Sequence, residues 1–127
     1  MTRTALACAA ALGVLLAACS GSAPQAAAAP ADLPASQLRI GLSEWKITTD
    51  VDRLAAGTVD LTVTNAGSTA HDLRVSFDGV ATTTTRLLQP GERERLTIDA
   101  PPTTTVALWC TVPGHDAQGM HTTLTTQ

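Results

Sequence analysis

Apolar and polar residues alternate with a period of two along several short stretches after residue 36. The alternation is cleanest over residues 58–64, where every second side chain is apolar. Turn-forming sequences separate the stretches, notably Asn65–Ser68 and Gln89–Glu92. The stretches lie at residues 38–46, 58–64, 71–77, 93–99, 105–110 and 120–126. Short strands punctuated by turns, without helical periodicity after the N-terminal segment, predict an all-β sandwich or barrel.

The N-terminal segment follows a different pattern, which predicts export. Arg3 precedes an apolar run, Ala5–Ala18, and the run leads into Leu-Ala-Ala-Cys at residues 16–19. A weakly positive start followed by an apolar segment is the plan of a secretory signal, and the last four residues resemble a bacterial lipobox. We therefore expect residues 1–18 to be a lipoprotein signal peptide and Cys19 to be lipidated. The alternatives are an ordinary signal peptide cut nearby or an uncleaved anchor, although about 14 residues are few for a membrane span.

Residues 19–35 are predicted to be a flexible tether. They consist almost entirely of Ala, Pro, Ser, Gly and Gln, with one Asp. Such a segment buries too little apolar surface to offset the entropy lost on ordering. The folded domain is therefore expected to span residues 36–127. This organisation predicts an exported protein, lipid-anchored to the outer face of the bacterial cytoplasmic membrane.

Composition and charge narrow the classes of partner. The 127-residue chain has a formal net charge of -3, and its eight Lys and Arg residues are scattered. Without a basic cluster there is nothing to follow a phosphate backbone, so nucleic acid is excluded as an expected partner. Aromatic residues are few, and Trp45 is predicted to lie in the core. Threonine is abundant and β-branched, which favours strands.

The three cysteines have different predicted fates. Cys8 lies in the signal peptide and Cys19 is the lipidation site, which leaves Cys110 alone in the folded domain. No disulfide within the domain is then possible. A single thiol outside the cytoplasm is exposed to oxidation unless it is buried or bound to a metal. Counting cysteines leaves both a buried hydrophobic role and a metal-ligand role open.

The end of the chain carries the candidate metal site. Cys110 closes a predicted strand, and the spacing Cys110-x₄-His115-x₄-Met120 lets a loop and the next strand return two further donors to it. His71 lies where an upstream loop meets a strand and can reach the same end of a sandwich. Two imidazoles, one thiolate and a weak axial thioether suit copper in electron transfer. Zinc is the alternative metal, but it prefers carboxylate to methionine.

These motifs resemble those of the cupredoxins, the plastocyanin-like and azurin-like blue copper proteins. The resemblance covers residues 38–127 and includes the Cys-Thr-Val-Pro-Gly-His sequence at 110–115. It implies a Greek-key β-sandwich holding one type 1 copper ion, with His71, Cys110, His115 and Met120 as ligands. It also implies that electrons pass through the exposed ring edge of His115.

The resemblance further implies a pair of residues that bridges the two ligand loops. In many cupredoxins an Asn follows the first ligand His, and a Ser or Thr follows the Cys. Here these positions hold Asp72 and Thr111. An ionised Asp accepts hydrogen bonds but cannot donate one, and its charge should favour Cu(II). His121 is expected on the surface.

The expected function is electron transfer by copper cycling between Cu(II) and Cu(I) at the membrane face. The alternative is a copper-binding or copper-delivery lipoprotein without redox turnover. An enzyme is not expected, because copper enzymes of this class need many more His ligands than the three present. The expected partners are redox proteins that bind weakly and transiently, together with the membrane through the N-terminal lipid. The protein is expected to be a monomer.

Overall fold

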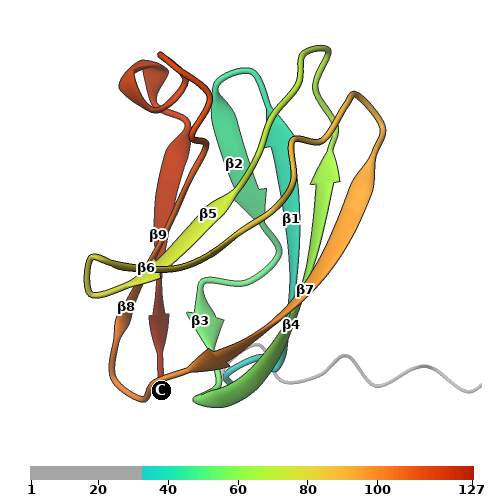
Figure 1. Cartoon of the computed structure of the whole chain (residues 1–127). Coiled ribbons are helices and arrows are strands. Elements are labelled where there is room, and N and C mark those ends of the chain that lie inside the picture. The colour runs from blue at the N-terminus through green and yellow to red at the C-terminus, as the bar shows by residue number, and fades with distance from the viewer. Residues whose placement is uncertain (1–32) are drawn as a thin grey trace, which may run out of the picture.

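The computed structural model describes residues 33–127 (Figure 1). The predicted signal peptide, the lipidation site Cys19 and most of the predicted tether lie outside the described residues. No helix in the described part is long and apolar enough to cross a membrane. The elements are β1 (Gln37–Ser43), β2 (Lys46–Thr49), β3 (Arg53–Leu54), β4 (Gly57–Asn65), β5 (Arg74–Phe77), β6 (Val80–Thr84), β7 (Arg93–Ala100), β8 (Thr105–Trp109), the 3₁₀ helix η1 (Asp116–Gln118) and β9 (His121–Thr126).

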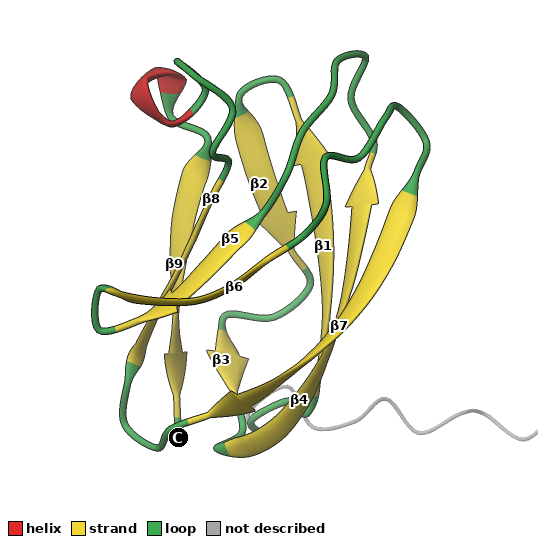
Figure 2. Ribbon diagram, in the orientation of Figure 1, coloured by secondary structure: helices red, strands yellow, loops and turns green. Residues whose placement is uncertain are grey.

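The strands form two mixed sheets that pack face to face (Figure 2). One sheet has the order β2-β1-β4-β7 and the other β3-β9-β8-β5-β6. The β1–β4 and β3–β9 pairs are parallel, and the remaining pairs are antiparallel. The chain changes sheet between β2 and β3, β3 and β4, β4 and β5, β6 and β7, and β7 and β8. The predicted all-β Greek-key sandwich is therefore confirmed.

The core lies between the sheets and is built from the alternating residues. Val59, Leu61 and Val63 of β4 are all buried, while the residues between them face outward. Leu61 pairs with Leu38 of β1 on one side and with Leu96 of β7 on the other. Full burial of one such side chain contributes about 1.5–3 kcal/mol. The central position of β4 therefore makes it a main source of the sandwich's stability.

The first alternating stretch differs from the expectation. The chain reverses at Glu44 and Trp45, so the stretch is divided between β1 and β2, which pair as an antiparallel hairpin. Trp45 lies at the tip of this hairpin and is 39% exposed. The prediction that Trp45 belongs to the core was wrong, because a residue at a turn is outside the strand alternation that points side chains inward.

Four connections meet at one end of the sandwich. They are the β1–β2 turn, the loop between β4 and β5, the connection between β6 and β7, and the loop between β8 and β9 that contains η1 (top of Figure 1). The C-terminus lies at the opposite end. The carbonyl of Leu42 in β1 accepts a hydrogen bond from the Ala66 N–H at 2.8 Å, which ties the first two connections together. This end carries the candidate site.

Candidate metal centre

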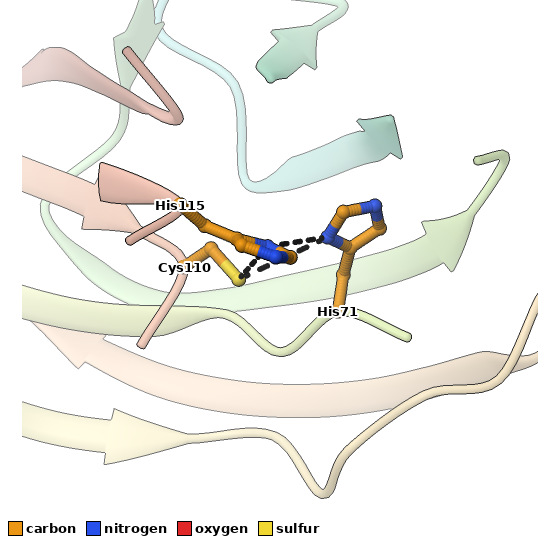
Figure 3. Close-up of side chains that lie close together, drawn as sticks. All are labelled: His71, Cys110 and His115. Atoms are coloured by element: carbon orange, nitrogen blue, oxygen red, sulfur yellow. Dashed lines mark hydrogen bonds between the residues drawn. The ribbon is translucent and has the colours of Figure 1, made fainter. Parts of the chain in front are cut away.

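Three buried donor side chains meet at this end of the sandwich. The ligand atoms of His71, Cys110 and His115 all lie within 4.8 Å of one another. Nδ1 of His71 is 3.1 Å from Nδ1 of His115, and the Cys110 sulfur is 3.9 Å and 3.5 Å from these two nitrogens. Figure 3 shows the sulfur and the two ring nitrogens pointing toward one another. The structure thus brings together three of the four predicted ligands.

The β8–β9 loop positions two of these donors and the predicted fourth ligand. Cys110 directly follows β8, and its N–H donates to the carbonyl of Met120 at 3.1 Å. The Met120 N–H in turn donates to the carbonyl of His115 at 3.1 Å, and Met120 is fully buried. Gly119 has φ +100°, a left-handed conformation that glycine adopts without strain. These two backbone hydrogen bonds close the β8–β9 loop and hold the Met120 backbone next to Cys110 and His115.

His71 is held from the other side by the β4–β5 loop. Its N–H and carbonyl both pair with Leu88, at 3.1 and 2.8 Å. Asn65, at the end of β4, is fully buried and donates from its side-chain nitrogen to the carbonyls of Thr69 and Leu88, at 2.7 and 2.8 Å. Its side-chain oxygen accepts the Gly67 N–H at 2.9 Å. Asn65 therefore fixes the loop that presents His71.

The donor set fits one metal ion. Metal–nitrogen distances of about 2.0 Å and metal–sulfur distances of about 2.3 Å, as in zinc sites, place ligands roughly 3–4 Å apart around one ion. The three observed separations, 3.1, 3.5 and 3.9 Å, fall in this range. Two imidazoles and a thiol, with a buried methionine next to them, match the trigonal donor set of type 1 copper. The site therefore fits a single type 1 copper ion.

Asp72 and Thr111 connect the two ligand loops. Oδ1 of Asp72 accepts the Thr111 N–H at 2.6 Å, and Oδ2 accepts the Thr111 hydroxyl in a short hydrogen bond. Because an ionised carboxylate only accepts, both donors must come from Thr111. The contact joins the residue after His71 to the residue after Cys110. Asp72 and Thr111 therefore form the bridge between the two loops, and the Asp72 carboxylate adds a negative charge to it.

His121 takes no part in the donor cluster. Its side chain is 60% exposed, and its Nδ1 lies 2.8 Å from Oδ1 of Asp116. This is the surface position expected for it. The neighbouring residue, Met120, directly precedes β9 and is fully buried.

Burial and fixed charges shape the chemistry of the site. Burial raises the pKa of the Cys110 thiol, and the Asp72 carboxylate raises it further, while backbone N–H groups of Asp72 and Val112 oppose the shift. Since the thiolate is the metal ligand, metal binding must release this proton. Backbone N–H groups, first that of Glu44 itself and then those of Thr69 and Ser68, hold the pKa of the Glu44 carboxyl well below its usual range.

Three residues at the site were not recognised as site residues from the sequence. Oε1 of Glu44 lies 3.3 Å from Nε2 of His71. The Trp45 ring meets the His115 ring edge-on, with 4.8 Å between centroids. The Asn65 side chain hydrogen-bonds to Gly67 and Thr69 of the loop that carries His71. The only available signal was the asparagine at the end of an alternating strand, which is typical of a turn; Glu44 and Trp45 reach the site only because the β1–β2 hairpin folds over it.

The fold is similar to that of solved blue copper proteins. The chain is similar to reduced auracyanin from Roseiflexus castenholzii, with a TM-score of 0.61 and 20% identity, covering 74% of this chain and 98% of that one. It is similar to auracyanin A, a "blue" copper protein from Chloroflexus aurantiacus, with a TM-score of 0.59 and 21% identity over 72% and 98% of the two chains. For reduced rusticyanin the values are 0.54, 16%, 75% and 82%. No protein-family model matches the chain, and no curated protein is similar to it in sequence. The expected cupredoxin fold is confirmed.

Proposed function

We propose that this protein is a type 1 copper electron carrier that cycles between Cu(II) and Cu(I) at the outer face of the bacterial cytoplasmic membrane. The observation that carries the proposal is the buried triangle of His71, Cys110 and His115, with donor atoms 3.1–3.9 Å apart. Auracyanin A, which has a similar fold, is a copper protein. His71, Cys110 and His115 would hold the ion, and the thioether of the buried Met120 would be a fourth, weak donor.

The protein's own residues favour fast electron transfer. Copper in this site would supply reversible one-electron chemistry. The ligands come from two loops. Backbone hydrogen bonds close the β8–β9 loop, the Asn65 side chain fixes the β4–β5 loop, and the Asp72–Thr111 bridge joins the two. A site held so firmly cannot rearrange its donors when the charge of the ion changes, so the reorganisation that slows electron transfer stays small. An electron carrier, rather than an enzyme, is the function that suits such a site.

His115 is the point at which electrons would enter and leave. It is 9% exposed, whereas His71, Cys110 and Met120 are 0–1% exposed. Exposed Pro113 and Ala117 flank it in the same loop, and the exposed Trp45 ring rests against it. The rim also includes the exposed Asp116 carboxylate, which pairs with His121. A small patch of this kind suits brief docking over a small interface. The expected partners are redox proteins that bind weakly.

The test is Cu(II) addition to the full chain purified in detergent, followed by optical spectroscopy and redox titration. An intense blue thiolate-to-copper band with a reversible one-electron wave is expected. Cys110→Ser should abolish the band, whereas the matched change His121→Asn, outside the donor cluster, should keep it. A colourless complex that passes copper to a chelator would support copper delivery instead, and a band that survives Cys110→Ser would refute the site.

The membrane location is a separate part of the proposal and rests on the Leu-Ala-Ala-Cys sequence at residues 16–19. Metabolic labelling with a radioactive fatty acid should mark the wild-type protein. Cys19→Ala should remove the label. A wild-type protein that takes up no label would refute lipid anchoring without touching the copper site.

A further inference from the structure

The Glu44 carboxylate makes an unusual number of contacts for a residue at a hairpin tip. Its Oε1 accepts the backbone N–H groups of Ser68 and Thr69, both at 2.8 Å. The hydroxyls of the same two residues lie 3.3 and 3.0 Å from this oxygen. The side chain is only 28% exposed. Glu44 is thus fixed across 24 and 25 residues of sequence to the loop that carries His71.

The same oxygen faces the outer nitrogen of His71. Oε1 of Glu44 lies 3.3 Å from Nε2 of His71, which is completely buried. An ionised carboxylate can only accept a hydrogen bond, so Nε2 must carry the hydrogen. The lone pair of the neutral ring is then on Nδ1, which points to Cys110 and His115 (Figure 3). The contact therefore selects the tautomer and the ring orientation that a metal in the triangle requires.

Gly67 supplies the space for this contact. A Cβ at residue 67 would lie 2.8 and 2.9 Å from the two carboxylate oxygens of Glu44 and 3.0 Å from Nε2 of His71. Any larger residue would push the carboxylate away from the imidazole. Gly67, the Glu44 carboxylate and the loop N–H groups together therefore place the carboxylate against Nε2 of His71.

We infer that Glu44 is a positioning residue of the copper site, which holds His71 in its Nε2–H tautomer and places a negative charge behind this ligand. The inference rests on the proposed function for its redox consequence. Carboxylates that hydrogen-bond to metal-ligating histidines raise the basicity of the ligand, and their loss typically costs 10–100-fold in metal affinity. Negative charge and a more basic imidazole stabilise Cu(II) more than Cu(I), so Glu44 lowers the reduction potential.

The first experiment measures the charge effect with Glu44→Gln. The amide oxygen of glutamine can still accept from the loop N–H groups and from His71, so the geometry is kept while the charge is removed. We expect the Cu(II) dissociation constant of the full-length protein to rise at least tenfold more than the Cu(I) constant. A tenfold difference corresponds to a potential about 59 mV higher. Gly67→Ala, which displaces the carboxylate by contact, should shift the potential in the same direction.

The matched control is Asp52→Asn. Asp52 is almost fully exposed, and its side chain meets only the neighbouring Arg53 among the described contacts, so this change removes one negative charge far from His71. Its potential should equal that of the wild type within error. A Glu44→Gln shift no larger than the control shift would overturn the inference.

The second experiment needs no copper. In metal-free wild-type protein, ¹⁵N–¹H correlation spectra of the imidazole nitrogens at pH 8 should show His71 protonated at Nε2 only. Glu44→Ala should produce a mixture of tautomers, while Glu44→Gln should retain the wild-type pattern. His71 found with its hydrogen on Nδ1 in the wild type would refute the positioning role. If the wild type binds no copper, the proposed function fails, and this measurement still decides the role of Glu44.

Discussion

Asp72→Asn offers a clean electrostatic perturbation of the proposed copper site. Asp72 accepts two hydrogen bonds from Thr111, one from the backbone N–H and one from the hydroxyl. An asparagine can accept the N–H with its oxygen and donate its amide hydrogen to the hydroxyl, which then acts as acceptor. Both contacts of the bridge survive, and only the charge is lost. The variant should therefore keep the fold and the blue colour.

The size of the effect follows from the position of the charge. The carboxylate is hydrogen-bonded to Thr111, the residue after Cys110, and because consecutive Cα atoms are about 3.8 Å apart it lies on the order of 8 Å from an ion in the triangle. A unit charge at that distance is worth about 1–2 kcal/mol at an effective dielectric constant of roughly 20–40. With about 1.4 kcal/mol and 59 mV per factor of ten, the reduction potential should rise by about 40–90 mV.

The assay is a spectroelectrochemical titration of the blue band at constant ionic strength. Asp78→Asn is the matched control, because Asp78 lies at the far end of β5 and its Oδ1 accepts the Thr105 N–H, a bond that asparagine can keep. The control should leave the potential where it is. A lower potential in Asp72→Asn, or equal shifts in both variants, would refute the assignment of a specific electrostatic role to Asp72.

Three further predictions concern the loops and the thiol. Gly119→Ala should lower the free energy of urea unfolding by about 1–2 kcal/mol, because the residue adopts a left-handed conformation with φ +100°. Asn65→Leu should cost about 1–3 kcal/mol by the same measurement, since at a fully buried position it removes the side-chain hydrogen bonds to the Thr69 and Leu88 carbonyls and the acceptor of the Gly67 N–H. Burial raises the pKa of the Cys110 thiol, so the unfolded chain loses this proton first as pH rises. In the metal-free protein, the stability associated with the thiol should be intact below about pH 8.5 and decline as pH rises through the folded-state pKa; Cys110→Ser should remove that decline, and a wild type and variant with parallel profiles would contradict it.

The long core strands could be predicted because their signal is local. Apolar residues face the core at alternate positions along much of β4 and over the second half of β7, and alternation within one strand is enough to reveal it. β6 lacked this signal: its sequence Val-Ala-Thr-Thr-Thr is largely exposed, and it is a strand because it pairs with β5 at the edge of a sheet. The two-residue β3 likewise exists through its pairing with β9 and with Ala35. Tertiary pairing determines these elements, and no pattern within the segment records it.

The candidate ligands could be named from the sequence for a different reason. Cys110, His115 and Met120 are close in sequence, so one loop suffices to bring them together, and their chemistry narrows the metal. His71 was the harder step, because 39 residues separate it from Cys110, but its place at the start of an alternating stretch put it at a strand end. The strands of a sandwich end at one or the other of its two ends, so His71 and Cys110, which both lie at strand ends, can be expected to lie close together.

The surroundings of the ligands required the structure, and they govern the potential. Glu44 is 27 residues from His71 and reaches it only through the tight β1–β2 reversal. The sequence identified Asp72, but only the structure shows that its carboxylate turns toward Thr111, the residue after Cys110, where its charge can affect the potential. Both carboxylates favour Cu(II), whereas the buried thioether of Met120 favours Cu(I). The donor types therefore point to the metal from sequence, while we expect the balance between these two charges and one sulfur to set the potential of the proposed copper site.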